Sequence, residues 1–123
     1  MTEGKSSKQY DLEKRTLEFA KGVRDFTTKA PKSISNLEYS KQIIRSSGSV
    51  GANYIEANES LSKKDFILRI KICRKESKET RYWLELFGLG GDEGLEKERR
   101  ALIQEATELM MIFSSIMRKT NPV

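Results

Sequence analysis

The stretch from Lys63 to Tyr82 carries the side chains in this sequence that are best suited to bind a negatively charged ligand. At the α-helical period of about 100° per residue, seven of its eight basic residues fall within an arc of about 120°. With the one aromatic residue inside that arc they form what we call the basic stripe: Lys63, Lys64, Lys71, Arg74, Lys75, Lys78, Arg81 and Tyr82. Asp65, Glu76 and Glu79 fall outside the arc. A one-sided row of cations is typical of a surface that binds nucleic acid, although a solvated helix face has the same pattern.

The net charge of the chain is concentrated in the same stretch. The 123 residues include 23 basic and 18 acidic ones, which gives +5. Residues 61–82 contain 8 basic and 3 acidic residues, which alone gives +5, whereas residues 83–123 contain 5 and 7, which gives −2. Cations in a row contact phosphates, and phosphate contacts position a nucleic acid without reading its sequence. The sequence therefore predicts nucleic-acid binding of low sequence specificity.

The remaining polar residues give little support for catalysis or metal binding. Histidine is absent and Cys73 is the single cysteine, which removes the commonest general base and leaves too few ligands for a zinc site. The nearest polar constellation consists of Asn53, Tyr54, Glu56 and Glu59. Di-metal bundles use Glu-x-x-His pairs from facing helices, and no such pair exists here. We therefore expect a protein that is not an enzyme and that takes no metal, cofactor or small-molecule substrate. Arg45, Asn53 and Glu56 are expected to make packing or interface hydrogen bonds.

The segment SSGSVGAN, residues 46–53, has the composition of a loop. It also resembles a glycine-rich phosphate cradle or the G-x-x-G loop of an RNA-binding KH module, but both of these need strands, and no strand pattern is visible. The apolar phase continues unbroken from Ile43 to Tyr54, which predicts one helix with Gly48 and Gly51 on its buried side. The same arc includes Leu37, Ile44 and Ile55. Two interior glycines cost about 2 kcal/mol relative to alanine, and in return they permit another helix to come close.

Apolar periodicity predicts four helices, over approximately residues 9–30, 34–61, 63–87 and 93–119. The signals at their ends are Pro31, Ser33 or Ser35, Ser62 and Asp92. Cys73 lies in the middle of the apolar seam of the third helix, where a small core residue is expected rather than a nucleophile. Four helices with short connections predict an all-α fold, an antiparallel up-down-up-down four-helix bundle, with residues 1–123 as a single domain.

A second apolar stripe flanks the core face of the third helix, and it consists of Leu68, Ile72, Trp83 and Leu86. Together the two stripes cover about half of the helix circumference, which is more than one bundle core usually requires. A wide core in a monomer is one interpretation, but we expect a symmetric homo-oligomer with these four residues at its interface. No apolar run approaches the roughly 20 residues of a membrane span, and the amino-terminal residues have no signal-peptide core. We therefore expect a cytoplasmic protein without membrane contact.

Three blocks of the sequence resemble a known protein family. They are YDLEKRTLEFAKGVRDF (residues 10–26), SKQIIRSSGSVGANYIEANES (residues 40–60) and KDFILRIKICRKESKETRYWLEL (residues 64–86). The most specific part is the pattern R-S-x-x-S-x-x-A-N-x-x-E-A from Arg45 to Ala57. The blocks are similar to four-helix-bundle proteins encoded in intervening sequences of bacterial 23S ribosomal RNA genes. The resemblance covers residues 10–118, the last helix only as an amphipathic pattern.

This resemblance implies a four-helix bundle and a homo-oligomer, which we expect to be a pentamer because related proteins form barrel-shaped homopentamers. The accessory protein of diversity-generating retroelements is similar, and it is a basic pentamer that binds nucleic acid and a reverse transcriptase. We therefore expect an oligomeric accessory protein that binds nucleic acid, with RNA favoured over DNA. The alternative is a protein–protein interaction scaffold, or a reverse-transcriptase accessory factor, that makes no contact with bases.

Overall fold

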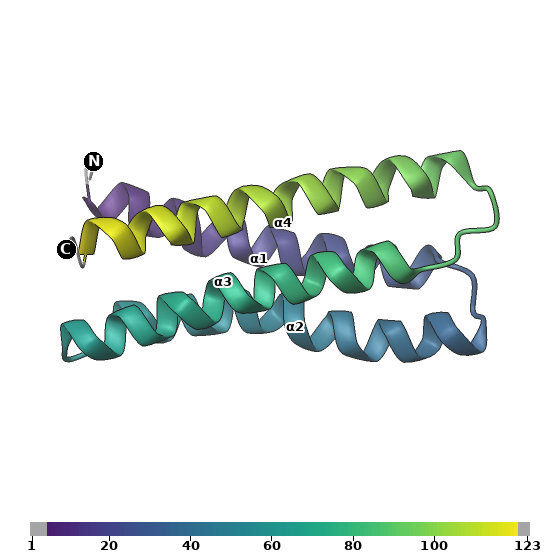
Figure 1. Ribbon diagram of the computed structural model, residues 1–123. Coiled ribbons are helices and arrows are strands. Elements are labelled where there is room, and N and C mark those ends of the chain that lie inside the picture. The colour runs from purple at the N-terminus through teal and green to yellow at the C-terminus, as the bar shows by residue number, and fades with distance from the viewer. Residues whose placement is uncertain (1–4, 121–123) are drawn as a thin grey trace.

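The structure, a computed structural model, describes residues 5–120, with side-chain environments given from Leu12 onward. Within this range the chain forms four helices and no strand. They are α1 (Lys5–Lys29), α2 (Ile34–Asn58), α3 (Lys63–Leu86) and α4 (Glu93–Thr120). The helices pack lengthwise into a four-helix bundle, which confirms the expected fold class (Figure 1). None of the helices in this range combines the length and the hydropathy needed to cross a membrane.

Contacts between the helices reveal the direction in which each one runs. Between α2 and α1 the contacts are Asn58–Glu13 and Gly51–Thr16. Between α2 and α3 they are Ser46–Thr80 and Asn53–Arg69. Between α3 and α4 they are Arg74–Ser114 and Arg81–Thr107. In each set the residue number rises on one helix as it falls on its neighbour, so consecutive helices are antiparallel. Figure 1 shows the resulting arrangement, with the α2–α3 turn at one end of the bundle and the other two connections at the opposite end.

Side-chain caps start three of the helices. Ser33 Oγ accepts a hydrogen bond from the backbone N–H of Asn36 at 3.1 Å, so it is this serine, and not Ser35, that caps α2. Ser62 and Asp92 cap α3 and α4 in the same way, each accepting a hydrogen bond from the N–H three residues later. Such caps satisfy backbone donors that have no partner inside the helix.

The carboxyl end of α2 lies three residues earlier than expected, at Asn58. There the backbone N–H of Ser60 donates to the carbonyl of Ala57 at 3.0 Å, a tighter turn than that of an α-helix. The chain then leaves the helix axis, and Leu61 lies in the connection to α3 with its side chain fully exposed. The expectation that α2 extends to Leu61 and buries it is therefore wrong.

One continuous apolar core runs along the bundle. Its large side chains without solvent contact are Val23, Phe26, Ile43, Val50, Ile70, Leu84, Leu109 and Phe113. Cys73 is buried among them, with its Sγ atom 3.3 Å from the carbonyl oxygen of Val50. Burial raises the pKa of the Cys73 thiol to about 12. Because only the thiolate is an effective nucleophile, this thiol is an inert core residue at neutral pH.

The two glycines of α2 have different environments. A Cβ atom on Gly51 would lie 2.9 Å from Thr16 Oγ1, so the missing side chain lets α1 and α2 approach each other. Gly48 is exposed, and apart from its own stretch of helix backbone no atom lies within 4 Å of the position that its Cβ would occupy. The expectation that both glycines lie on the buried side is thus wrong for Gly48. The same correction applies to the other residues of that arc, which are about half exposed: Leu37, Ile44 and Ile55. Among the residues of this arc, Gly51 is the one that packs against α1.

Two polar side chains tie together the end of the bundle that holds the α1–α2 and α3–α4 connections. The buried Asn36 amide donates from Nδ2 to the carbonyl oxygens of Pro31 (2.9 Å) and Gly88 (2.7 Å), and its Oδ1 accepts from the N–H of Gly88 at 3.0 Å. Arg99 of α4 donates to the carbonyl of Phe87 at 2.7 Å. Carbonyls at the end of a helix lack an intrahelical donor, so Arg99 supplies one to α3.

Candidate nucleic-acid interface

The basic stripe lies along the solvent-facing side of α3. Its lysines and Tyr82 are exposed, and its two arginines are partly exposed. Tyr82 is 56% exposed, and its ring packs edge-on against Trp83 with the ring centroids 5.2 Å apart. From Lys63 to Arg81 the stripe is about 27 Å long at 1.5 Å per residue. The residues singled out in the sequence therefore share one accessible surface.

The two arginines of the stripe are held by hydroxyl groups of α4. Arg74 Nη1 donates to Ser114 Oγ at 3.4 Å, and Arg81 Nη1 donates to Thr107 Oγ1 at 3.1 Å. Neither hydroxyl carries a charge, so the guanidinium groups keep their positive charge unneutralised while their positions are constrained. Such an arrangement favours binding of an external anion, because less side-chain entropy is lost on binding.

The acidic neighbours of the stripe on α3 are engaged elsewhere. Arg45 of α2 donates from Nη2 to Glu76 Oε1 at 3.2 Å and to Glu79 Oε2 at 2.7 Å. Among the side chains of residues 12–120, no carboxylate forms an ion pair with a cation of the stripe. The stripe is therefore an uncompensated row of positive charge.

One exposed acid in the same arc was missed by the sequence reasoning. Glu85 lies seven residues after Lys78, which at the helical period places the two side chains on nearly the same line along α3. The spacing alone was enough to find it. Glu85 also lies four residues after Arg81, so it places one negative charge beside the carboxyl end of the positive row.

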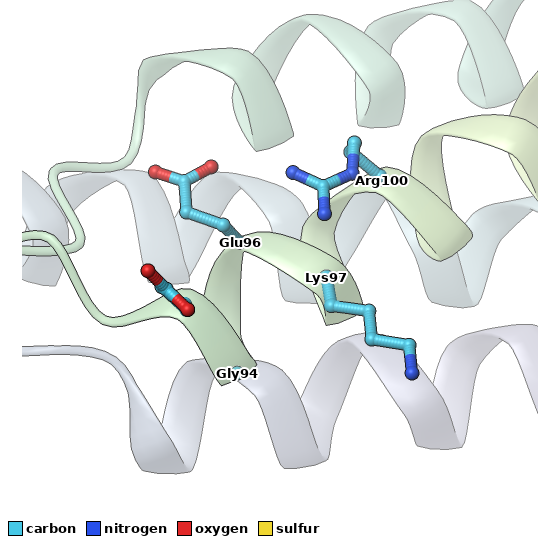
Figure 2. A pocket seen from close by; sticks show the side chains of 5 residues that line it. Gly94, Glu96, Lys97 and Arg100 are labelled. Atoms are coloured by element: carbon cyan, nitrogen blue, oxygen red, sulfur yellow. The ribbon is translucent and has the colours of Figure 1, made fainter.

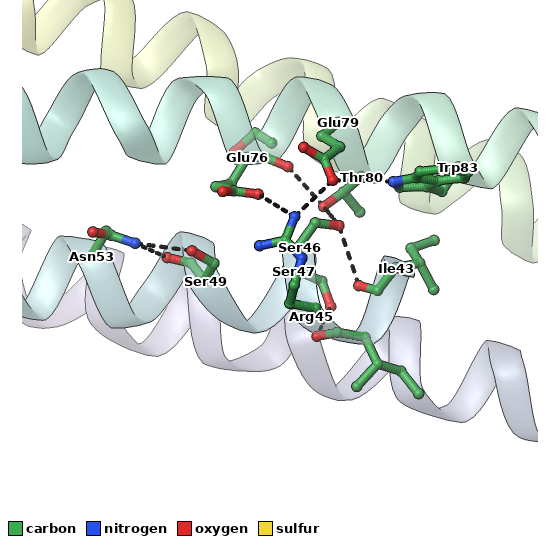
Figure 3. A network of polar contacts seen from close by, with 12 residues as sticks. Ile43, Arg45, Ser46, Ser47, Ser49, Asn53, Glu76, Glu79, Thr80 and Trp83 are labelled. Atoms are coloured by element: carbon green, nitrogen blue, oxygen red, sulfur yellow. Dashed lines mark hydrogen bonds and ion pairs between the residues drawn. The ribbon is translucent and has the colours of Figure 1, made fainter. Parts of the chain in front are cut away.

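The pattern from Arg45 to Ala57 joins α2 to α3 (Figure 3). Besides the Arg45 ion pairs, Ser46 Oγ and Thr80 Oγ1 share a hydrogen bond of 2.8 Å in the core. Farther along, Asn53 Oδ1 accepts a hydrogen bond from Arg69 Nη1 at 2.9 Å. These polar side chains project toward α3 at three levels of the bundle. The glycine- and serine-rich segment is thus a helix-packing element and has no open backbone on which a phosphate could lie.

The second apolar stripe of α3 is only partly covered within one chain. Leu68 is 54% exposed and Leu86 is 39% exposed, whereas Ile72 and Trp83 are half-buried. The indole Nε1 of Trp83 donates to Glu79 Oε2 at 3.2 Å, which ties its position to the Arg45 network. The structure therefore leaves an apolar edge on α3 beside the basic stripe.

The polar constellation considered for catalysis is not brought together. Tyr54 is buried, packs against Phe113 with the ring centroids 6.2 Å apart, and has a raised pKa because of burial. Glu56 and Glu59 are exposed, and Glu56 makes no side-chain hydrogen bond among the described residues, so its expected packing role is not observed. In residues 12–120 no three acidic or cysteine side chains are grouped as a metal site requires.

A shallow pocket lies at the start of α4, beyond the carboxyl end of the stripe. It is lined by Glu93, Gly94, Glu96, Lys97 and Arg100 (Figure 2). Its charges are mixed, and Glu96 is paired with Arg99 at 2.8 Å. An open depression with balanced charges and no enclosed apolar wall does not define a small-molecule site.

Comparisons with known proteins agree with this architecture. Residues 8–115 match the protein family described as 23S rRNA-intervening sequence protein. A crystal structure of a protein of unknown function from the S23 ribosomal protein family of Bacteroides thetaiotaomicron is 33% identical, with a TM-score of 0.76, over 90% of this chain and 98% of that one. No functionally curated protein matches the chain. The family match spans most of the chain and the structural neighbour has the same fold, so this protein belongs to the 23S rRNA-intervening sequence protein family.

Proposed function

We propose that this protein binds nucleic acid through the basic stripe of α3, without catalysing a reaction. The observation that carries the proposal is the uncompensated charge. Seven cations lie on one accessible face, and none of them pairs with a carboxylate of residues 12–120. Two acids of α3 outside the stripe, Glu76 and Glu79, share an ion pair with Arg45 of α2. Phosphates are the ligands that such a row attracts, through release of their condensed counterions.

The chemistry of the stripe favours low sequence specificity. Five of its seven cations are lysines, which act as flexible point charges, and only Arg74 and Arg81 can make bidentate contacts. The family is named for an intervening sequence of 23S rRNA, so we propose RNA as the ligand, in preference to DNA.

We further propose that the protein acts as a homo-oligomer, a pentamer by the family resemblance. The support is the apolar edge of Leu68 and Leu86, together with the half-exposed Leu37, Ile44 and Ile55 on a different helix. Two distinct apolar surfaces suit a ring, in which each subunit uses one surface toward each neighbour. A ring repeats the basic stripe and raises avidity without any new type of contact.

The test is titration of structured RNA and of duplex DNA at two salt concentrations. The test variant carries Lys71→Glu, Arg74→Glu, Lys75→Glu and Lys78→Glu. The matched control carries Lys14→Glu, Lys21→Glu, Arg24→Glu and Lys41→Glu, all exposed residues of α1 and α2. Both variants change the net charge from +5 by −8 to −3, and the control also breaks three exposed ion pairs of small energy, those of Lys21, Arg24 and Lys41.

Loss of binding in the α3 variant with retention in the control supports the proposal. Equal affinity of the two variants overturns it, since binding then depends on net charge alone. If neither variant affects binding, the stripe is not the site. A protein partner whose capture survives nuclease treatment and is lost in the α3 variant favours the scaffold alternative.

A further inference from the structure

Helix α4 is acidic by composition, yet four of its five acids are turned toward α1 or paired within the helix, and the fifth, Glu93, is exposed in the first turn. Arg15 of α1 binds Glu105 (2.6 Å) and Glu108 (2.7 Å), and Lys29 of α1 binds Glu98. Glu96 is paired with Arg99 of the same helix, which also holds the end of α3. Beyond its first turn, therefore, α4 has no unpaired acid on the side that faces α3.

Four cations of α4 form no ion pair in the described part of the chain, and two of them, Arg100 and Arg118, lie on that side. Thr107 and Ser114 mark it, because they accept hydrogen bonds from the α3 arginines. Arg100 lies seven residues before Thr107, and Arg118 lies four residues after Ser114, so all four residues fall within about 40° at the helical period. Both arginines are exposed, and neither forms an ion pair with another side chain of residues 12–120. Figure 2 shows Arg100 projecting from a different side of α4 than Lys97.

We infer that the nucleic-acid surface spans both α3 and α4, and that its ligand is a double helix. This inference rests on the proposed function and adds Arg100 and Arg118 to the site. The surface then has a row of lysines on the outer side of α3 and two arginines, Arg100 and Arg118, on the side of α4 that faces α3. Arg74 and Arg81 reach from α3 toward α4 between them. Packed helices are about 8–10 Å apart, a separation of the same order as the groove widths of B-form DNA, about 6 to 12 Å, and A-form RNA likewise presents two phosphate strands across each groove. Each set of cations can therefore meet a different phosphate strand.

The aromatic residues point to the same ligand. Proteins that bind single strands stack successive bases on exposed aromatic side chains. In residues 12–120 only Tyr82 is an exposed aromatic residue, and a single aromatic side chain cannot stack a run of successive bases. A duplex needs no such platform, because its bases are already stacked and its phosphates are presented on the outside.

The test compares the full chain with its Arg100→Gln/Arg118→Gln variant, with Lys14→Gln/Lys21→Gln as the control of equal charge. Fluorescence anisotropy measures binding of a 20-base-pair RNA duplex, a 20-base-pair DNA duplex and an unstructured 20-nucleotide RNA at several salt concentrations. We expect the α4 variant to lower the salt slope for duplex by about 2 and its affinity by roughly tenfold or more at 0.1 M salt, with no change in the control. We expect the wild type to bind duplex at least about tenfold more tightly than single strand.

The outcomes separate this inference from the proposed function. If the reversal of the α3 lysines and arginine abolishes binding but the α4 variant matches its control, the surface is confined to α3 and the two-helix inference is wrong. If single strand binds as tightly as duplex, the ligand class is wrong even where α4 contributes. If the α3 reversal has no effect, the proposed function itself fails. All four substituted arginine and lysine side chains are exposed, so circular dichroism should show unchanged folding.

Discussion

Gly51 of α2 lies directly against Thr16 of α1. A methyl group on Gly51 would come within 2.9 Å of Thr16 Oγ1 and 3.2 Å of its Cβ. Thr16 is buried, and its hydroxyl donates to the carbonyls of Leu12 and Glu13, so it has little room to move. Three residues away, a methyl group on Gly48 would contact no neighbouring side chain and no other helix. One segment thus contains two glycines with opposite roles.

The Gly51→Ala variant should be less stable than the wild type, and the Gly48→Ala variant should be more stable. At Gly48 alanine adds only helix propensity, worth about 0.5 to 1 kcal/mol. At Gly51 the clash with a stiff neighbour exceeds that gain, since overpacking costs about 1 to 3 kcal/mol. Urea denaturation measures both. In a Gly51→Ala/Thr16→Ala double variant part of the loss should be recovered, and full additivity of the two changes would contradict the contact.

The Asn36→Ala variant should lose about 2 to 3 kcal/mol of unfolding free energy. The buried amide makes three hydrogen bonds to the two connections, and its removal leaves their backbone groups without partners. The Asn36→Asp variant should lose at least as much, because it places a buried carboxylate oxygen against the carbonyl oxygens of Pro31 and Gly88. Hydrogen exchange at the Gly88 amide gives a local readout, and an unchanged exchange rate in Asn36→Ala would show that this side chain does not hold the connection.

The Arg45→Ala variant should lose about 2 to 3 kcal/mol, because it leaves the Glu76 carboxylate, only 8% exposed, without its cation. The Glu79→Gln variant should lose no more than about 1 kcal/mol, since that carboxylate is more exposed and Gln can still hydrogen-bond. Adding Glu76→Gln to Arg45→Ala should restore stability. Thermal unfolding followed by the fluorescence of Trp83 measures all three, and a double variant no better than Arg45→Ala would argue against an unpaired carboxylate as the cause.

Stability should fall at alkaline pH through Cys73. Burial raises its folded-state pKa to about 12, whereas an exposed thiol has a pKa of about 8.5, so the unfolded chain loses this proton first. The contribution is complete below the unfolded pKa and declines as the pH rises toward 12, by at most about 1.4 kcal/mol per pH unit. Other groups titrate in the same range, so the comparison is with Cys73→Ala. The alkaline decline should be shallower in that variant, and parallel curves would refute the assignment.

The Leu68→Ser/Leu86→Ser variant should lower the molar mass in solution relative to the wild type. These side chains are the exposed part of the second apolar stripe, and an interface loses most when its apolar contacts are removed. The control is Leu17→Ser/Met111→Ser, which removes two comparably exposed apolar side chains from α1 and α4. Light scattering distinguishes them. An unchanged molar mass in the first variant would remove α3 from the interface.

The sequence was sufficient to predict the fold because the apolar phase of each helix is a local property. It places Cys73 in the core and makes the glycine-rich segment helical, as observed. Phase alone could not separate Gly48 from Gly51, since both lie near one edge of the apolar arc. Which of them contacts α1 depends on how far that helix reaches around α2, which no local pattern specifies.

The candidate site was predicted only on α3, where basic residues outnumber acidic ones. Arg100 and Arg118, which we propose to add to the site, did not emerge from the sequence because charge was counted along the chain. Counting treats Glu105 and Glu108 as neighbours of these arginines, although in space they belong to Arg15. Long-range ion pairs thus redistribute charge between the faces of a helix, and such pairs cannot be read from a single sequence.

The arrangement of the connections also determines where the polypeptide could be cut and rejoined. The start of α1 and the end of α4 lie at the same end of the bundle as the α2–α3 turn, whereas Asn36 fastens the opposite end (Figure 1). A short linker from α4 back to α1, with new termini opened at the exposed Leu61, therefore gives a circular permutant that keeps every helix and its packing. Opening the chain at Gly88 instead would break the Asn36 hydrogen bonds. The two ends of the bundle therefore differ in how well they tolerate a change in chain connectivity.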